Sequence, residues 1–291
     1  MGLADGPTVL ITGANSGIGF ETSRELARRS ARVLMVARDR ERGERALSDV
    51  TGVAERSAAP SPELLIADLT DPEQVQFLID TIRARHSRIS VLVNNAGGYF
   101  AHRATTEEGF ERTWALNVVA PIRLTLGLLD LLTESAPARV INVASHAHTA
   151  GRLDMDDLQM ANGTYRGFLQ YARAKSALIL WTDALARRTN PQSVSAVSVH
   201  PGWINTGFGA ANRGSAAAAM FRFFTTLFAA PAAKGARPIV ELVDRPPVGD
   251  PPGDVVTGEY FLKTRRQLPA AHARDRRVAD LLWELGLTYK L

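Results

Sequence analysis

The chain has 291 residues, 45% of them hydrophobic and 22% charged, so it can form one large α/β domain or two ordinary ones. Its net charge of +4 is small and has no basic run behind it, which argues against a nucleic-acid partner. The absence of cysteine excludes disulfides, thiolate metal sites and a cysteine nucleophile. The six histidines are scattered, so we assign no metal site.

The N-terminal residues do not form a charged leader followed by an apolar stretch, so we expect no signal peptide. The most apolar segment, residues 216–233, is interrupted by Arg222 and Pro231. It is short for a membrane span, which needs about 20 residues. We therefore expect a cytoplasmic protein without a transmembrane segment, and a buried or membrane-touching helix stays open for this segment.

A short apolar strand, a glycine-rich loop and an amphipathic helix open the chain. Residues 8–11 have the apolar, β-branched character of a buried parallel strand and run directly into the loop at 12–19. Strand, loop and helix in this order are the context that a dinucleotide-binding fingerprint requires. Glycines let the backbone approach a pyrophosphate, and the helix N-terminus offers N–H donors. The loop residues that we expect to bind the cofactor are Gly13, Asn15, Ser16, Gly17, Ile18 and Gly19.

The end of the second predicted strand, residues 32–37, should meet the adenosine ribose. An acid there would bind the 2′-hydroxyl of NAD, but the strand is followed by Arg38, whose guanidinium suits a 2′-phosphate. We therefore predict NADP(H), with NAD(H) as the less favoured cofactor. Asp39 would favour NAD if the strand ended one residue later; its alternative role is the N-cap of the next helix.

Strands alternate with helices along the rest of the chain. Further strands are predicted at 64–67, 89–93, 139–143, 193–199 and 258–262. Between them we expect a loop at 51–62, a helix from Pro72, and a long helix over 105–133 that carries Asn117 and kinks at Pro121. A terminal helix should cover 278–287.

This alternation predicts an α/β fold, a doubly wound parallel β-sheet in three αβα layers, as a single domain over 1–291. Ligands should lie at the carboxyl ends of the strands, where Asp68, Asn95, Ser145 and Pro201 fall. After the sixth strand, aromatic residues gather between Met220 and Phe228. We interpret 205–237 as a substrate lid, with a core segment as the alternative, and 258–291 as a C-terminal strand and helix.

Tyr171 and Lys175 are four residues apart on a predicted helix and should share one face. An ammonium beside a phenol favours phenolate, and could lower the pKa of the tyrosine from about 10 toward about 7. A phenol with such a pKa is a general acid or base. The alternative is a pair on a solvated helix face. Tyr171 is the one tyrosine of five with a lysine four residues later.

Taken in order, these motifs resemble the short-chain dehydrogenases/reductases over essentially the whole chain. They are residues 12–19, residues 94–97, Asn117, Ser145, Tyr171 with Lys175, and Pro201-Gly202 with Thr206. Residues 37–39, 142–148 and 258–261 are most similar to the branch of retinol dehydrogenases and the WW-domain-containing oxidoreductase. Two features should depart from that branch: we expect no counterpart of the N-terminal anchor of its membrane-bound members, and 211–237 matches nothing in it.

The resemblance implies a Rossmann-type fold and a mechanism. Tyr171 would exchange a proton with the substrate oxygen, and Lys175 would tune it and hold the nicotinamide ribose. Ser145 would hydrogen-bond the substrate oxygen, and Asn117 would hold a water that links Lys175 to solvent. For the cofactor, Asp68 and Leu69 would flank adenine, Asn95 would meet a ribose and Thr206 the carboxamide. The remaining contacts that the resemblance implies are Ala96, Gly97, Pro201, Gly202 and Ile204.

We expect an NADP(H)-dependent oxidoreductase that acts on a secondary alcohol, ketone or aldehyde. Four aromatic residues near the motifs suggest a bulky apolar substrate: Phe100, Trp114, Trp203 and Phe208. The inference is limited because aromatic residues also fill protein cores. The alternative function is a non-catalytic NADP(H)-binding sensor or scaffold. A sugar-nucleotide epimerase is disfavoured, because its glycine loop is usually one residue shorter. A homo-oligomer is possible in either case.

Overall fold

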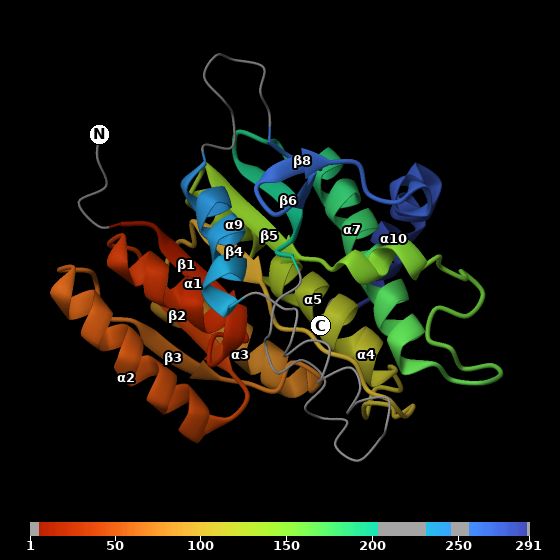
Figure 1. Ribbon diagram of the computed structural model, residues 1–291, viewed down its shortest axis with the longest axis horizontal. Helices are drawn as coiled ribbons and strands as arrows, with labels where there is room; N and C mark the ends of the chain where they lie inside the picture. Colours follow the sequence, from red (N-terminus) through yellow and green to blue (C-terminus); the bar gives the residue numbers. More distant parts are fainter. Residues whose placement is uncertain (1–5, 203–230, 246–255, 290–291) are drawn as a thin grey trace.

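The computed structural model describes residues 6–202, 231–245 and 256–289, which form an α/β fold around one eight-stranded sheet (Figure 1). The strand order is β3-β2-β1-β4-β5-β6-β7-β8; β1 to β7 are parallel and β8 is antiparallel to β7. The strands are β1 (Thr8–Thr12), β2 (Arg32–Ala37), β3 (Glu63–Ile66), β4 (Val91–Asn94), β5 (Ala138–Val143), β6 (Val194–His200), β7 (Tyr260–Leu262) and β8 (Arg265–Gln267). The predicted doubly wound parallel sheet is confirmed.

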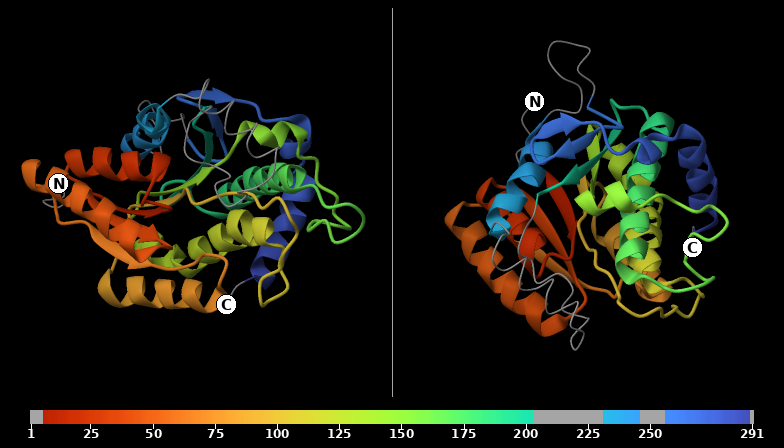
Figure 2. Two further views of the ribbon diagram at one scale, coloured as in Figure 1. Left: turned by 60° about the horizontal axis from the view of Figure 1, so that its bottom comes forward. Right: turned by 45° about the vertical axis from the view of Figure 1, so that its right-hand side comes forward.

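Two apolar cores, one on each face of the sheet, hold the helices in place. On β1, Val9 and Ile11 face one core and Leu10 the other, as the alternation of a strand requires. The first core is covered by α1 (Gly17–Arg28), α2 (Arg40–Arg56) and α9 (Ala232–Asp244). The second is covered by α3 (Pro72–Arg85), α5 (Ala120–Gly127), α6 (Leu129–Glu134), α7 (Gly167–Arg188) and α10 (Arg276–Thr288). The right-hand view of Figure 2 shows these two helical layers on either side of the strands.

The long helix expected over 105–133 is wrong in its start and its continuity. It begins with α4 (Arg112–Trp114), passes through the π-helical turn η1 (Ala115–Val119) into α5, and breaks at Leu128 before α6. In the π-helical turn the Ala120 N–H donates to the Ala115 carbonyl. Pro121 has no N–H to offer Asn117, four residues earlier, so the widened turn comes directly before the proline.

Three further expectations need correction. Residues 51–56 are helical, because α2 continues to Arg56. The strand β8 was missed, because its three residues are polar and exposed and carry no apolar alternation. The lid expected over 205–237 is wrong at its end, since residues 232–237 begin α9, whose buried side chains pack against the sheet and α1. Residues 205–230 of that expected lid lie outside the described residues.

The C-terminal helix α10 covers α7 and the segment that carries Asn117. Trp283 of α10 stacks on Trp181 of α7 with ring centroids 6.1 Å apart. Beyond α10, the hydroxyl of Tyr289 accepts a hydrogen bond from the indole N–H of Trp114 (3.1 Å), and its carbonyl accepts one from Arg123 (2.7 Å). The end of the described chain is therefore anchored to α4 and α5.

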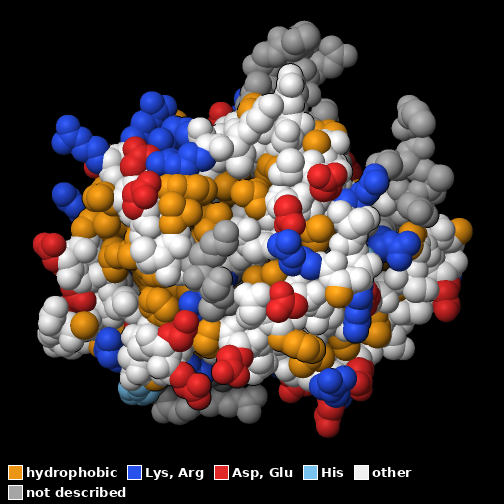
Figure 3. Space-filling view, turned by 180° about the vertical axis from the view of Figure 1, so that it is seen from behind, with side chains coloured by type: hydrophobic (Ala, Val, Ile, Leu, Met, Phe, Trp, Pro, Cys, Tyr) orange, Lys and Arg blue, Asp and Glu red, His pale blue; other side chains and the backbone are white. Residues whose placement is uncertain are grey.

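The face turned away from the viewer in Figure 1 carries a broad area of apolar side chains with basic and acidic groups around it (Figure 3). Whether a second copy of the chain covers any of this face stays a prediction. Within residues 6–202, 231–245 and 256–289, no helix has both the length and the apolar character needed to cross a membrane.

Replacing Tyr289 with Phe should destabilise the protein by about 1–3 kcal/mol, because the buried indole N–H of Trp114 loses its acceptor. The measurement is the free energy of unfolding in guanidinium chloride. Leu281→Ala on the exposed side of α10 is the control, and should change stability by less than about 0.5 kcal/mol. An unchanged unfolding midpoint for Tyr289→Phe would show that this anchor contributes nothing.

Candidate active site

The glycine loop between β1 and α1 is built for a close backbone approach. Gly13 has a φ of +66°, and a Cβ added to Gly19 would lie 2.3 Å from the Gly13 carbonyl oxygen. Neither position tolerates a side chain without a shift of the backbone. Ser16 precedes α1 but its side chain makes no capping hydrogen bond. The first turn of α1 therefore keeps its N–H groups for another acceptor, which is the arrangement that binds phosphate groups.

The segment after β4 is tied to this loop. The backbone N–H groups of Asn95 and Ala96 both donate to the hydroxyl of Thr12, at 3.0 and 2.9 Å. The side-chain amide of Asn95 donates to the Thr12 carbonyl at 2.8 Å. Asn95 therefore holds the loop and β4 together, and its expected contact with a ribose stays a prediction.

Arg38 stands at the end of β2 with most of its side chain exposed, and one of its guanidinium nitrogens lies 3.8 Å from the Asp68 carboxylate. Asp68 is held by the backbone N–H and the hydroxyl of Thr70, at 2.9 and 2.8 Å. The Asp39 carboxylate accepts from the backbone N–H of Arg42 (2.9 Å) and caps α2. The alternative role of Asp39 as an N-cap is thus confirmed, and Arg38 is the side chain that projects from the strand end.

Asn117 and Lys175 converge on the backbone of Gly97. A Cβ added to Gly97 would lie 2.8 Å from the Asn117 Oδ1 and 3.1 Å from the Lys175 Nζ. Both side chains are buried. The Asn117 amide donates to the carbonyls of Gly98 and Thr113, each at 2.7 Å, and the Lys175 ammonium donates to the Val143 carbonyl at 2.8 Å. The structure therefore brings these two predicted site residues together at the carboxyl ends of β4 and β5.

Ser145 and Tyr171 form the second half of the site. Ser145 follows β5, and its hydroxyl is hydrogen-bonded to the phenol of Tyr171, which is buried on α7. Lys175 lies one turn further along α7, with its nitrogen 5.6 Å from the centre of the Tyr171 ring. The helix places Tyr171 and Lys175 on one face, as expected from their spacing.

The expected electrostatics of this pair are wrong. Burial raises the pKa of Tyr171 to about 12, while its hydrogen bond with Ser145 lowers the pKa by less. Burial also lowers the pKa of Lys175 to about 7. The ammonium donates to the Val143 carbonyl, and removal of both groups from water outweighs their mutual attraction.

A buried acid that the sequence analysis missed supports Asn117. Glu111 is fully buried at the start of α4; its two oxygens accept the backbone N–H groups of Thr113 (2.7 Å) and Trp114 (2.9 Å). The Tyr165 hydroxyl donates to the same carboxylate at 2.9 Å. This cap joins the long segment between Ser145 and Tyr171 to the helix that carries Asn117. An acid directly before a predicted helical segment, three residues ahead of Trp114, is the signal that could have revealed it.

Two aromatic rings lie beside the phenol of Tyr171. The ring centres of Tyr99 and Phe168 lie 6.3 Å apart, and each lies 6.4 or 6.3 Å from the Tyr171 ring. Phe168 is 48% exposed, although it is a large apolar side chain beside a buried one. Trp114, expected near the substrate, is instead fully buried in the core and bonded to Tyr289, so that expectation is wrong.

The strand β6 ends at His200 and is followed by Pro201 and Gly202 at the same edge of the sheet; Gly202 has a φ of +102°. Ile204 and Thr206, expected to complete this part of the site, lie outside the described residues, as do Trp203 and Phe208. Among the residues that the structure describes, no group of histidine and acidic side chains could hold a metal ion.

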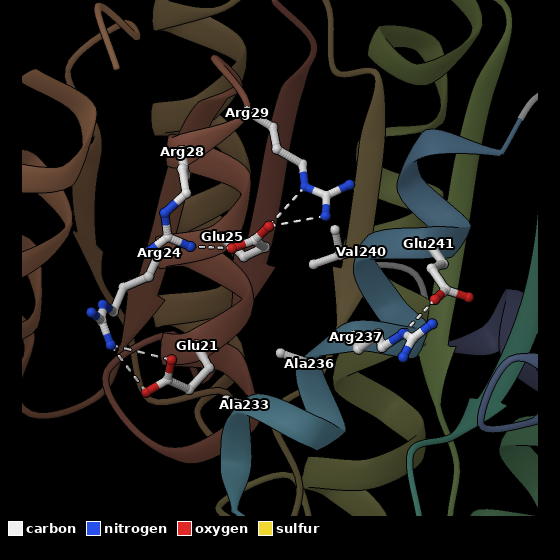
Figure 4. A pocket seen from close by; sticks show the side chains of 10 residues that line it. All are labelled: Glu21, Arg24, Glu25, Arg28, Arg29, Ala233, Ala236, Arg237, Val240 and Glu241. Carbon is white, nitrogen blue, oxygen red and sulfur yellow. Dashed lines mark hydrogen bonds and ion pairs between the residues drawn. The ribbon is translucent and has the colours of Figure 1, made fainter. Parts of the chain in front are cut away.

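A separate hollow of about 560 Å³ lies between α1 and α9, in the helical layer opposite to α7 (Figure 4). Its arginines are paired with acids on their own helices: Arg24 with Glu21 (3.3 Å), Arg29 with Glu25 (2.9 Å) and Arg237 with Glu241 (2.7 Å). Arg28 also pairs with Glu25. The hollow is distinct from the site at the strand ends.

The sequence profile of the short chain dehydrogenase family matches residues 7–216. The chain is 39% identical to the "Putative daunorubicin C-13 ketoreductase DnrU" of Streptomyces sp. (strain C5), over 96% of this chain and 91% of that protein. It is 34% identical to human retinol dehydrogenase 13, over 96% of this chain and 82% of that protein.

A crystal structure of an uncharacterized protein from Mycobacterium paratuberculosis superposes with a TM-score of 0.72 at 30% identity, covering 98% of this chain and 96% of that one. The fold, the family profile and these relatives all carry the same assignment. The chain belongs to the short-chain dehydrogenase/reductase family, within the branch that contains the retinol dehydrogenases.

Proposed function

We propose that the protein is an NADP(H)-dependent oxidoreductase that interconverts a bulky, largely apolar ketone or aldehyde and the corresponding alcohol. The observation that carries this proposal is the hydrogen-bonded pair of Ser145 and Tyr171, with Lys175 and Asn117 meeting at Gly97 beside it. All four side chains lie at the carboxyl edge of the sheet, where the glycine loop also opens.

The residues present fit a nicotinamide dinucleotide, since the loop admits a close backbone approach and α1 begins without a side-chain cap. The cofactor would supply or accept a hydride when it is bound. Residues of the glycine loop and of 95–97 would line its binding site, with Asp68 and Leu69 at the adenine end. Lys175 and Tyr171 would lie at its nicotinamide end, and Pro201, Gly202, Ile204 and Thr206 would complete that end.

Tyr171 acts as the general acid in carbonyl reduction, and as the base in the reverse direction. A phenol whose pKa is raised to about 12 is protonated at neutral pH, so it is ready to donate a proton to a carbonyl oxygen. The Ser145 hydroxyl, bonded to that phenol, can share the charge that develops on the same oxygen. These protonation states suit reduction better than oxidation.

Lys175 and Asn117 support this proton transfer. Lys175 has a pKa lowered to about 7, so its proton is exchangeable near neutral pH. Because Lys175 and Asn117 both lie beside Gly97, a water held by Asn117 could return a proton to the site. Gly97 keeps this route open, since any side chain there would collide with both residues.

Arg38 selects NADP(H) in this proposal. The charge and planar fork of a guanidinium match a 2′-phosphate, and Arg38 is the exposed cation at the end of β2. Asp39, the acid that could bind a 2′-hydroxyl, is engaged as the cap of α2. Asp68 lies near Arg38 and orients it.

The substrate class follows from the aromatic rings of Tyr99 and Phe168 beside the phenol. An exposed phenylalanine next to the reactive group gives a flat apolar surface against which a ring system can stack. Two relatives, named for daunorubicin and for retinol, also point to ring-bearing, mostly apolar substrates.

NADPH oxidation at 340 nm should be observed with polycyclic ketones and retinal, and much less with short aldehydes. Tyr171→Phe should lower kcat by about 10²–10⁴-fold, because it removes the proton donor. NADPH affinity should stay within about threefold, because the phenol oxygen contributes little to binding the cofactor. Tyr260→Phe, the same chemical change at a tyrosine of β7, is the matched control.

If the protein binds NADPH but turns over no carbonyl of this panel, the alternative of a non-catalytic sensor or scaffold gains support. If Tyr171→Phe retains full turnover, the general acid is a different group.

Arg38→Asp should weaken NADPH binding by at least about tenfold and leave NADH binding nearly unchanged, because one charge-assisted contact is lost. Titration of cofactor fluorescence measures both affinities. Arg40→Asp is the control, since Arg40 is an equally exposed arginine that pairs with Glu44 on α2. Equal losses of NADPH and NADH affinity would contradict the 2′-phosphate role.

Phe168→Ala should lower kcat/KM for polycyclic ketones by up to about tenfold, because an aromatic stacking contact is removed. Short aldehydes should change by less than about threefold, since they do not reach that ring. Phe77→Ala removes an even more exposed phenylalanine from α3 and should change neither substrate class. A uniform loss over all substrates would mean that Phe168 supports α7 instead of the substrate.

A further inference from the structure

The backbone carbonyl of Ser145 accepts two hydrogen bonds from one residue, His148. The His148 backbone N–H lies 3.1 Å from it and the ring nitrogen Nδ1 lies 2.8 Å from it. The Ser145 hydroxyl in turn accepts the N–H of Ala147 at 3.2 Å and is bonded to Tyr171. The short 3₁₀ turn at 146–150 therefore sets where the serine hydroxyl stands relative to the phenol.

The partners of the His148 ring define its tautomer. The backbone N–H of Ala270 lies 3.2 Å from Nε2. A backbone N–H can only donate, so Nε2 must accept, and the one proton of a neutral ring lies on Nδ1. That proton is the one donated to the Ser145 carbonyl. Both ring nitrogens are thereby satisfied in a side chain that is only 2% exposed.

The C-terminal arm, defined here as residues 263–275, holds this histidine from outside the turn. Its His272 lies with Nε2 2.9 Å from the His148 carbonyl, which also accepts the Ser176 hydroxyl at 3.0 Å. Because Ser176 follows Lys175 on α7, the same carbonyl joins the arm to the helix that carries the reactive phenol. The His148 ring also packs on the ring of Tyr260, with centres 5.1 Å apart.

We propose that His148 is a positioning residue for Ser145: its Nδ1–H holds the serine carbonyl, and the Ala270 N–H of the C-terminal arm fixes the ring in the tautomer that can do so. Among the described residues, the ionisable side chains near His148 include His146 from the same turn, His200 from β6, Tyr260 from β7 and His272 from the arm. Burial lowers the pKa of His148, which keeps the ring neutral. The effect on catalysis rests on the proposed function; the tautomer and the hydrogen bonds do not.

The tautomer can be read directly from the ¹⁵N shifts of histidine-labelled protein at pH 7. We expect the His148 ring to be protonated on Nδ1 and not on Nε2. Its signals are assigned as those that disappear in His148→Asn. A ring protonated on Nε2, or on both nitrogens, would overturn the proposal whether or not the protein turns over a substrate.

Two variants separate the two hydrogen bonds of the ring. In His148→Asn, the side-chain nitrogen takes the place of Nδ1 and can still donate to the Ser145 carbonyl. In His148→Gln, the longer side chain puts its oxygen near the place of Nε2, so it can accept from Ala270 while the bond to Ser145 is lost. His146→Ala, an exposed histidine in the same turn, is the control.

We expect His148→Gln to lower kcat about tenfold with NADPH affinity unchanged, because one hydrogen bond that positions Ser145 is lost. His148→Asn should stay within about threefold of the unmodified protein, since asparagine has no tautomer to be selected. Hydrogen exchange of the Ala147 amide should quicken about tenfold in His148→Gln and not in His148→Asn.

Equal kcat losses in the two variants, or equal exchange at Ala147, would show that His148 only fills space. If the unmodified protein reduces no carbonyl, the proposed function fails, and the exchange data and the tautomer still decide whether His148 positions Ser145.

Discussion

The hydrogen bond from the Lys175 ammonium to the Val143 carbonyl sets the distance between α7 and the end of β5. Val143 is the last residue of its strand, and Ser145 follows two residues later, so the strand end and the helix are joined close to the point where the candidate site begins. Tyr171 lies one turn before Lys175 and consequently meets the Ser145 hydroxyl. A buried lysine without an acceptor would be unstable, so this contact constrains both the helix and the strand.

The same constraint explains why the site is surrounded by buried polar groups. Asn117 fills its amide hydrogen bonds with the carbonyls of Gly98 and Thr113, and Glu111 caps the helix from which Asn117 projects. Each of these groups is buried and needs its partner, because an unpaired one would cost about 1–3 kcal/mol. Polar groups that must be satisfied leave few alternative positions for the side chains, and the four site residues are held as one unit.

Much of this arrangement could be predicted from the sequence because it depends on local patterns. The glycine loop, the end of β2 at Arg38 and the spacing of Tyr171 and Lys175 all follow from periods and turn residues. What failed depends on long-range packing. Trp114 was expected to contact the substrate, but it is buried and bonded to Tyr289, which is far away in the sequence. The residues of β8 are polar, and they form a strand because they pair with β7.

The pKa expectation failed for a related reason. The spacing of two residues on a helix shows that their side chains share a face, but it does not show how deeply that face is buried. In the structure the face lies against the sheet, and the loss of water outweighs the attraction between a phenolate and an ammonium. The proton therefore rests on the tyrosine, which is the state that the proposed reduction of a carbonyl requires.

The last part of the chain contacts both halves of the site without reaching the reacting groups. Tyr289 binds Trp114 at the start of the helix that leads to Asn117, while Ala270 and His272 bind His148 in the turn after Ser145. A change in the packing of this region would affect the positions of Asn117 and Ser145 together, because it contacts Trp114 on the first side and His148 on the second. The C-terminal residues therefore contribute to holding the candidate site in place.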